Sequence, residues 1–134
     1  TNQNELIEAA GGLKEGCEKV ISGGPMMGFA MYTTDTPITK TSSSILCMSK
    51  DEVSACEPTA CINCGRCVDA CPSRIIPSRL ADFAERHDEE AFLKFNGLEC
   101  VECGSCSYVC PAKRQLKQAI GSMRKTALAN KKKK

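Results

Sequence analysis

The sequence contains no tryptophan, and aromatic residues make up only 4% of its 134 residues. Proteins that bind single-stranded nucleic acid stack bases on aromatic side chains in a basic groove, so we expect no nucleic-acid partner. No stretch approaches the roughly eighteen apolar residues of a membrane-spanning helix, so we expect no span of its own. The first residues also lack the basic start and apolar run that are typical of an export signal.

Cysteine is the residue in excess, at 11 of 134. A small secreted chain with this density would be a disulfide scaffold, but the count is odd and no export signal is present. A reducing compartment with metal-bound thiolates fits better. The net charge of +2 hides an asymmetry, because no acid follows Glu102 while many basic residues do. We expect a solvated cationic end; the alternative is docking on an acidic partner or an anionic membrane face.

Composition divides the chain into residues 1–50, residues 51–112 with nine of the eleven cysteines, and a basic helix and tail at 113–134. Residues 5–10 predict a short helix that Gly11 and Gly12 stop. Lys19 to Ser22 predicts a strand, and two further short strands are expected around 29–33 and 38–41. The expected fold class is therefore α+β.

A shift of 39 residues superposes the middle zone on itself, so one motif is used twice. The 28 residues between the two copies have helical punctuation. We expect Ser78 to cap one helix and Asp88 to cap a second, which Asn96 and Gly97 stop.

Each copy reads C-x2-C-x2-C-x3-C-P, the pattern by which bacterial ferredoxins bind 4Fe-4S clusters, with the fourth cysteine ligating the other cluster. We expect Pro72 and Pro111 to occupy the first position of a helix. Zinc is the alternative, but a zinc ribbon gives no reason for the third cysteine, the fourth or the proline. The spacing predicts one cluster on Cys61, Cys64, Cys67 and Cys110, and another on Cys71, Cys100, Cys103 and Cys106.

Three cysteines lie outside the repeat: Cys17, Cys47 and Cys56. We interpret them as small buried or free thiols. An alternative is that Cys56, five residues before Cys61, substitutes for a ligand. His87 is interpreted as a surface residue. The segment GGPMMG at 23–28 lacks the lysine of a phosphate loop, so we expect a structural turn.

Three segments resemble a known family: SGGPMMGFAMYTTDTPITKTSSSIL, CINCGRCVDACP and CVECGSCSYVCPAK. They are similar to the carboxyl-terminal part of the C subunit of the Rnf complex, the membrane-bound ion-translocating ferredoxin:NAD oxidoreductase. The resemblance implies an incomplete, β-grasp-like SLBB segment at 1–50. It further implies an α-helical ferredoxin domain with two 4Fe-4S clusters at 51–112.

The resemblance also implies electron transfer within such a complex, with other Rnf subunits and with flavin and iron-sulfur proteins as partners. The chain would lie peripherally at the cytoplasmic face of the cell membrane. We expect neither an FMN nor an NAD site, because nothing in these residues supplies the glycine-rich loop of the family's upstream flavin- and NAD-binding domain. We expect the chain to be either a fragment or the ordered part of a larger subunit. Two alternatives stay open: a cobalamin-reductase-like electron-transfer subunit of a bacterial microcompartment, and a structural domain that metal staples together.

Overall fold

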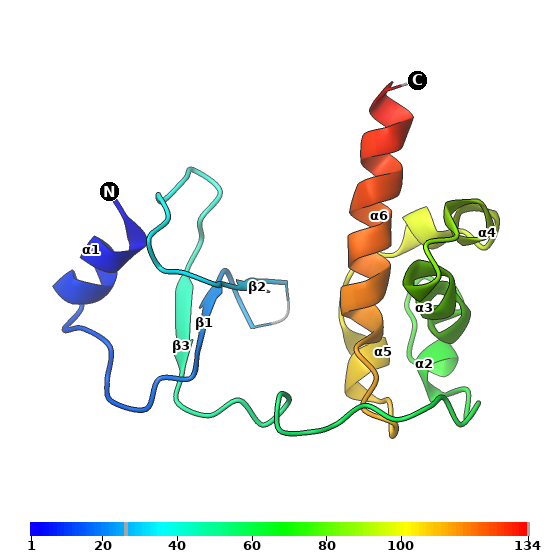
Figure 1. The fold of residues 1–134 in the computed structure, drawn as a ribbon, viewed down its shortest axis with the longest axis horizontal. Helices are drawn as coiled ribbons and strands as arrows, with labels where there is room; N and C mark the ends of the chain where they lie inside the picture. The colour runs from blue at the N-terminus through cyan, green and yellow to red at the C-terminus, as the bar shows by residue number, and fades with distance from the viewer. Residues whose placement is uncertain (26, 134) are drawn as a thin grey trace. The chain divides into compact units, whose positions relative to one another are not determined.

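The computed structural model describes residues 1–25 and 27–133. The chain forms two compact units, Thr1–Cys56 and Glu57–Lys134, called here the sheet unit and the cysteine unit. Figure 1 shows the small sheet of the first and the helices of the second. No helix among the described residues has both the length and the apolar character needed to cross a bilayer. The end of the basic tail, Lys134, and Met26 of the GGPMMG segment lie outside the described residues.

The sheet unit begins with α1 (Gln3–Ala9), which ends before Gly11 and Gly12 as predicted. Its sheet has the order β2-β1-β3, with β1 (Lys19–Ser22) in the centre, β2 (Phe29–Ala30) and β3 (Ile45–Met48). Both pairings are antiparallel, and Ser22 is opposite Phe29 on one side and Ile45 on the other. The strand predicted at 19–22 is therefore confirmed, and the one expected around 29–33 is present but shorter, as Phe29–Ala30.

The strand expected at 38–41 is wrong. The amide of Ser42 donates to the carbonyl of Thr39 at 3.0 Å, which closes a turn there. The edge of β1 is occupied by Ile45–Met48 instead. A run of β-branched residues predicts extended backbone, but which run pairs with β1 depends on contacts far along the chain.

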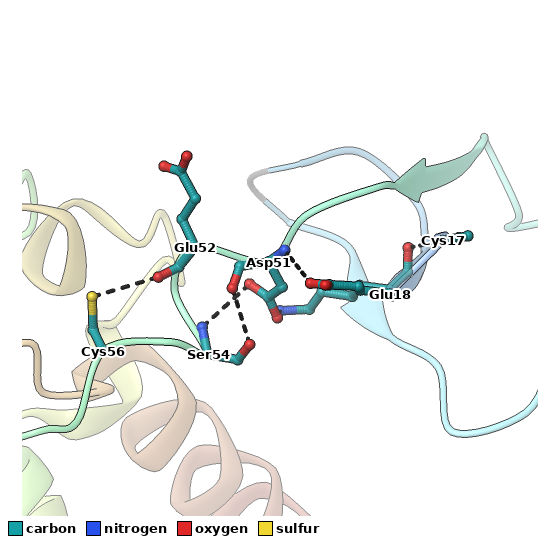
Figure 2. A network of polar contacts seen from close by, with 7 residues as sticks. Cys17, Glu18, Asp51, Glu52, Ser54 and Cys56 are labelled. Carbon is teal, nitrogen blue, oxygen red and sulfur yellow. Dashed lines mark hydrogen bonds and ion pairs between the residues drawn. The ribbon is translucent and has the colours of Figure 1, made fainter. Parts of the chain in front are cut away.

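The end of the sheet unit is held to the start of β1 by a polar network, drawn in Figure 2. The ammonium of Lys19 donates to Asp51 Oδ2 at 2.8 Å, and the amide of Asp51 donates to Glu18 Oε2 at 2.9 Å. The hydroxyl of Ser54 donates to the Asp51 carbonyl at 3.0 Å. Residues 51–54 are thus fastened to the central strand.

This network predicts an acid-sensitive contribution to the stability of the sheet unit. The hydrogen bond from Lys19, more than any other influence, lowers the pKa of Asp51 below its ordinary value of 3.8. A group with a lowered folded pKa stabilises the fold above the unfolded value and loses this effect as pH falls through the folded one. We expect Asp51→Asn to weaken amide-exchange protection in β1 and β3 at neutral pH. The difference from the parent chain should vanish at acid pH.

Hydrogen exchange measured by mass spectrometry at matched pH values checks this. Glu52→Gln is the control, because the Glu52 side chain is 83% exposed. Equal protection of the Asp51→Asn and parent chains at neutral pH would contradict the expectation.

The cysteine unit contains the same substructure twice. Helix α2 (Arg66–Asp69) and helix α3 (Pro77–Glu85) return, 39 residues later, as α5 (Ser105–Tyr108) and the start of α6 (Leu116–Lys133). Between the copies lie α4 (Glu89–Lys94) and a 3-10 turn, η1 (Gly97–Glu99). The sequence repeat is therefore also a repeat of backbone structure.

The core of the cysteine unit lies where α3 and α6 pack side by side (Figure 1). Leu80 from α3 and Phe92 from α4 are fully buried, with Leu116 and Ile120 from α6. Gly97 passes directly against the Phe92 ring, since a Cβ there would come within 2.3 Å of a ring carbon. The buried positions of α6 continue to Ala127, so this basic helix is packed along one side, while Lys131–Lys133 are exposed.

Of the two helix caps predicted from the sequence, the structure has one and lacks the other. The carboxylate of Asp88 accepts from the amide of Ala91 at 3.0 Å, which confirms the predicted cap of α4. The predicted cap at Ser78 is wrong, because α3 begins at Pro77 and its N-cap residue is Ile76, two residues before Ser78. Proline at the first helical position has no amide hydrogen, so it removes one of the unpaired donors of that turn. His87 is exposed, as interpreted.

Candidate metal centres

Two hollows in the cysteine unit are lined by cysteines from both copies of the motif. The first hollow is lined by Cys61, Cys64, Cys67 and Cys110. The second hollow is lined by Cys71, Cys100, Cys103 and Cys106. Each hollow thus takes three cysteines from one copy and the fourth from the other, which are the groupings that the spacing predicts.

The loops around the two hollows have the same unusual backbone. Asn63 and Glu102 have φ values of 55° and 57°, and Gly65 and Gly104 have φ values of 77° and 81°. Glycine adopts this left-handed region without steric cost, which explains its place in each copy. The turn aims backbone amides at sulfur: Asn63 N–H donates to Cys61 Sγ, and Glu102 N–H to Cys100 Sγ, both at 3.4 Å.

The prolines that follow the fourth cysteines are in turns, so the prediction that they start helices is wrong. Arg74 N–H donates to the carbonyl of Cys71, and Lys113 N–H to that of Cys110, both at 3.2 Å. Each turn has its proline at the second of four positions, where the fixed φ of proline suits a β-turn. The turn directs the chain from the cysteine toward α3 or α6.

The thiols of the second hollow differ in acidity. Burial raises the pKa of Cys106 to about 11, and burial also raises the pKa of Cys100. The Ser105 hydroxyl, 3.5 Å from Cys103 Sγ, lowers the pKa of that thiol. Thiols must lose their protons to bind a metal, so binding here would release protons.

The chemistry of each hollow fits an iron–sulfur cluster. Four cysteine thiolates are the ligand set of a 4Fe-4S cluster, and amide donors to sulfur are what tunes its potential. In the part of the chain that the structure describes, no three His, Cys, Asp or Glu side chains converge closely enough to hold a single metal ion.

The cysteines outside the repeat lie away from these linings. Cys17 is half-buried and Cys47 exposed on the sheet unit, and burial, followed by the nearby Cys17, raises the pKa of Cys47. Cys56 is exposed, and its thiol donates to the carbonyl of Glu52 at 3.5 Å (Figure 2). Glu52 belongs to the sheet unit, so this thiol is engaged there.

Charged residues beside the hollows were not predicted from the sequence. Arg114 lines the first hollow and forms ion pairs with Asp82 at 2.9 Å and Glu85 at 3.0 Å. Glu102 lines the second hollow and pairs with Arg124 at 3.4 Å. The 39-residue shift superposes Arg114 on Ile75. This replacement of an apolar residue by a charged one was the signal in the sequence that could have identified Arg114.

Comparison with known proteins gives a family for part of the chain. Residues 60–114 match the 4Fe-4S dicluster domain. This segment contains all eight cysteines of the two hollows.

Nearly the whole chain resembles longer curated proteins, each of them the C subunit of an oxidoreductase complex. It is 42% identical over 128 residues to that of the Na(+)-translocating ferredoxin:NAD(+) oxidoreductase complex of Acetobacterium woodii, covering 96% of this chain and 29% of the relative. It is 50% identical over 121 residues to that of the proton-translocating ferredoxin:NAD(+) oxidoreductase complex of Clostridium ljungdahlii, covering 90% and 26%. It is 46% identical over 116 residues to that of the ion-translocating oxidoreductase complex of Methanosarcina acetivorans, covering 87% and 26%. The chain thus spans less than a third of each relative.

Proposed function

We propose that this chain, a homologue of Rnf-type ion-translocating oxidoreductase C subunits over nearly all of its length, transfers electrons through two 4Fe-4S clusters. One observation carries the proposal: two hollows with equivalent backbones, each lined by four cysteines. A bound 4Fe-4S cluster supplies reversible one-electron chemistry.

The residues of the chain divide the work of holding the clusters. Cys61, Cys64, Cys67 and Cys110 are the proposed ligands in the first hollow, and Cys71, Cys100, Cys103 and Cys106 those in the second. The amides of Asn63 and Glu102 donate to ligand sulfur and so stabilise negative charge there. The crossed ligation joins the two copies of the motif, so the clusters also hold the unit together.

We propose three segments for the chain. Residues 1–50 form a β-grasp-like SLBB segment, and residues 51–112 form an α-helical ferredoxin domain with two clusters. Residues 113–134 form the basic helix and tail. In support, the small sheet with α1 and the helical cysteine unit are separate compact units, although the division between them falls after Cys56 and so leaves residues 51–56 with the sheet.

The proposed setting is a complex of the kind named for the relatives. The chain would act as a peripheral electron-transfer part of it at the cytoplasmic face of the membrane, with other subunits and flavin or iron–sulfur proteins as partners. Support comes from the names of the relatives' complexes, which include ferredoxin and NAD(+). We expect no FMN or NAD site in this segment.

Iron and sulfide analysis of anaerobically prepared protein tests the proposal, together with electron paramagnetic resonance after dithionite reduction. We expect about eight iron atoms per chain, because each of two cubanes contains four. Two neighbouring reduced clusters should give interacting paramagnetic signals. Iron that is present but does not accept electrons would contradict the proposal and favour a structural role, and a lack of iron would also contradict it.

A further inference from the structure

The two hollows are equivalent in backbone but not in charge. Their linings superpose under the 39-residue shift, and three superposed pairs differ in charge. With the residue of the first hollow given first, the pairs are Asn63 and Glu102, Ser78 and Lys117, and Arg114 and Ile75.

Arg114 is the one charged side chain among the described residues that line the first hollow. Its side chain is only 12% exposed, and Nη2 is held by Asp82 and Glu85. Burial alone would lower the pKa of Arg114, but the hydrogen bonds and charges of Asp82 and Glu85 outweigh burial and raise this pKa above its ordinary value. The guanidinium therefore stays charged. Its Nη1 is buried with no hydrogen-bond partner among the described residues. A buried donor of this kind is costly unless an acceptor meets it.

The second hollow has no equivalent of this unmatched donor among the residues that the structure describes. Ile75, at the position of Arg114, is buried and apolar. Glu102 and Lys117 add charges of opposite sign to the lining, and Arg124 Nη1 lies 3.4 Å from Glu102 Oε1. The guanidinium of Arg114 is therefore the main difference between the two electrostatic environments.

We infer that Arg114 raises the reduction potential of the cluster in the first hollow above that of the cluster in the second. This inference rests on the proposed function. Reduction adds one negative charge, which a buried guanidinium in the lining stabilises by its charge, and the unpartnered Nη1 is a donor available to the site. An electron on the domain then resides mainly at the first hollow. Cys61 and Cys64 are exposed there, whereas no cysteine of the second hollow is, so the first hollow is the more accessible of the two.

The test replaces Arg114 with the residue that stands at its equivalent position, as Arg114→Ile, in the full reconstituted chain. A potentiometric titration followed by electron paramagnetic resonance gives both potentials. We expect the higher one to fall by a tenfold change in equilibrium constant, which is about 59 mV for one electron, while the lower one moves far less. Arg114→Lys, which keeps the charge, should recover part of the shift.

Arg66→Gln is the matched control. It removes an arginine from the start of α2, between the lining residues Gly65 and Cys67, but Arg66 is exposed, and water screens its charge. We expect it to shift the potential much less than Arg114→Ile does.

The outcomes separate this inference from the proposed function. A parent chain without iron contradicts the proposed function. Full iron in Arg114→Ile with both potentials unchanged, or with only the lower one shifted, overturns the role of Arg114 and leaves the proposed function standing. If Arg114→Ile does not assemble clusters, Asp82→Asn decides, because the Asp82 side chain is 38% exposed and partly replaceable by water. Loss of the negative charge of Asp82 should raise the higher of the two reduction potentials. If that potential does not change in Asp82→Asn, the inference is overturned.

Discussion

A chain with Cys110→Ala will retain about four iron atoms instead of about eight, and the lost ones will be those of the first hollow. Cys110 belongs to the second copy of the motif, yet it lines the hollow of Cys61, Cys64 and Cys67. Loss of one thiolate of four leaves an iron without its protein ligand, so the cluster at that hollow should be lost or unstable. The cluster at the other hollow keeps all four of its proposed ligands.

Double variants distinguish crossed ligation from ligation within each copy of the motif. Cys61→Ala with Cys110→Ala removes two ligands of the same hollow and should still leave about four iron atoms. Cys103→Ala with Cys110→Ala removes one ligand from each hollow and should leave almost none. If each motif instead held its own cluster, these two results would be exchanged.

Cys56→Ala is the control for this series. Cys56 is exposed, and its thiol donates within the sheet unit, so its loss should leave the iron content at the parent value. A drop in iron content would mean that Cys56 substitutes for a ligand. Iron and sulfide analysis of the anaerobic proteins measures all of these outcomes together.

The helical part of the fold was largely predictable because its signals are local. The two-fold repeat, the cap at Asp88 and the end of α4 before Asn96 all follow from residue types at fixed spacings. The prolines were misread for the same local reason. Proline suits the first turn of a helix and the second position of a β-turn equally, and only the hydrogen bond from Arg74 to Cys71 distinguishes them.

The third strand could not be chosen from the sequence because strand pairing is not local. Residues 38–41 and 45–48 are both plausible extended runs, and β1 has room for one of them. Ile38 N–H donates to the carbonyl of Thr1 at 3.0 Å, more than thirty residues away, which takes the first run out of the sheet. Such a contact leaves no trace in local composition.

The charged residues beside the hollows can be identified only from the sequence repeat and the three-dimensional packing together. Arg114 lies next to the second motif in sequence but lines the first hollow, and its partners Asp82 and Glu85 are on α3. The repeat shows that Arg114 differs in charge from Ile75, its equivalent in the first copy. Only the ion pairs of Arg114 with α3 and its place in the lining show that it lies beside the first hollow.

Removing the iron from the intact chain will abolish most of its helical circular dichroism. The core of the cysteine unit is small, and two of the proposed ligands, Cys67 and Cys106, are buried within it beside Leu80 and Phe92. Without the clusters, eight thiols would line open hollows and the crossed links between the motif copies would be absent. Binding energy at such a site is also folding energy, so the unit should unfold with chelation.

Far-ultraviolet circular dichroism reports this unit almost alone, because the sheet unit contributes only the seven residues of α1 whereas α6 has eighteen. The measurement follows the signal while a chelator removes iron under anaerobic conditions. Amide exchange separates the units: protection should be lost in α3 and α6 but kept in β1 and β3, which have no ligand. A helical signal that survives complete loss of iron would show that apolar packing around Leu80 and Phe92 is sufficient by itself. Restoring iron and sulfide should return the circular dichroism signal, because cluster loss and not irreversible aggregation is the expected cause of its disappearance.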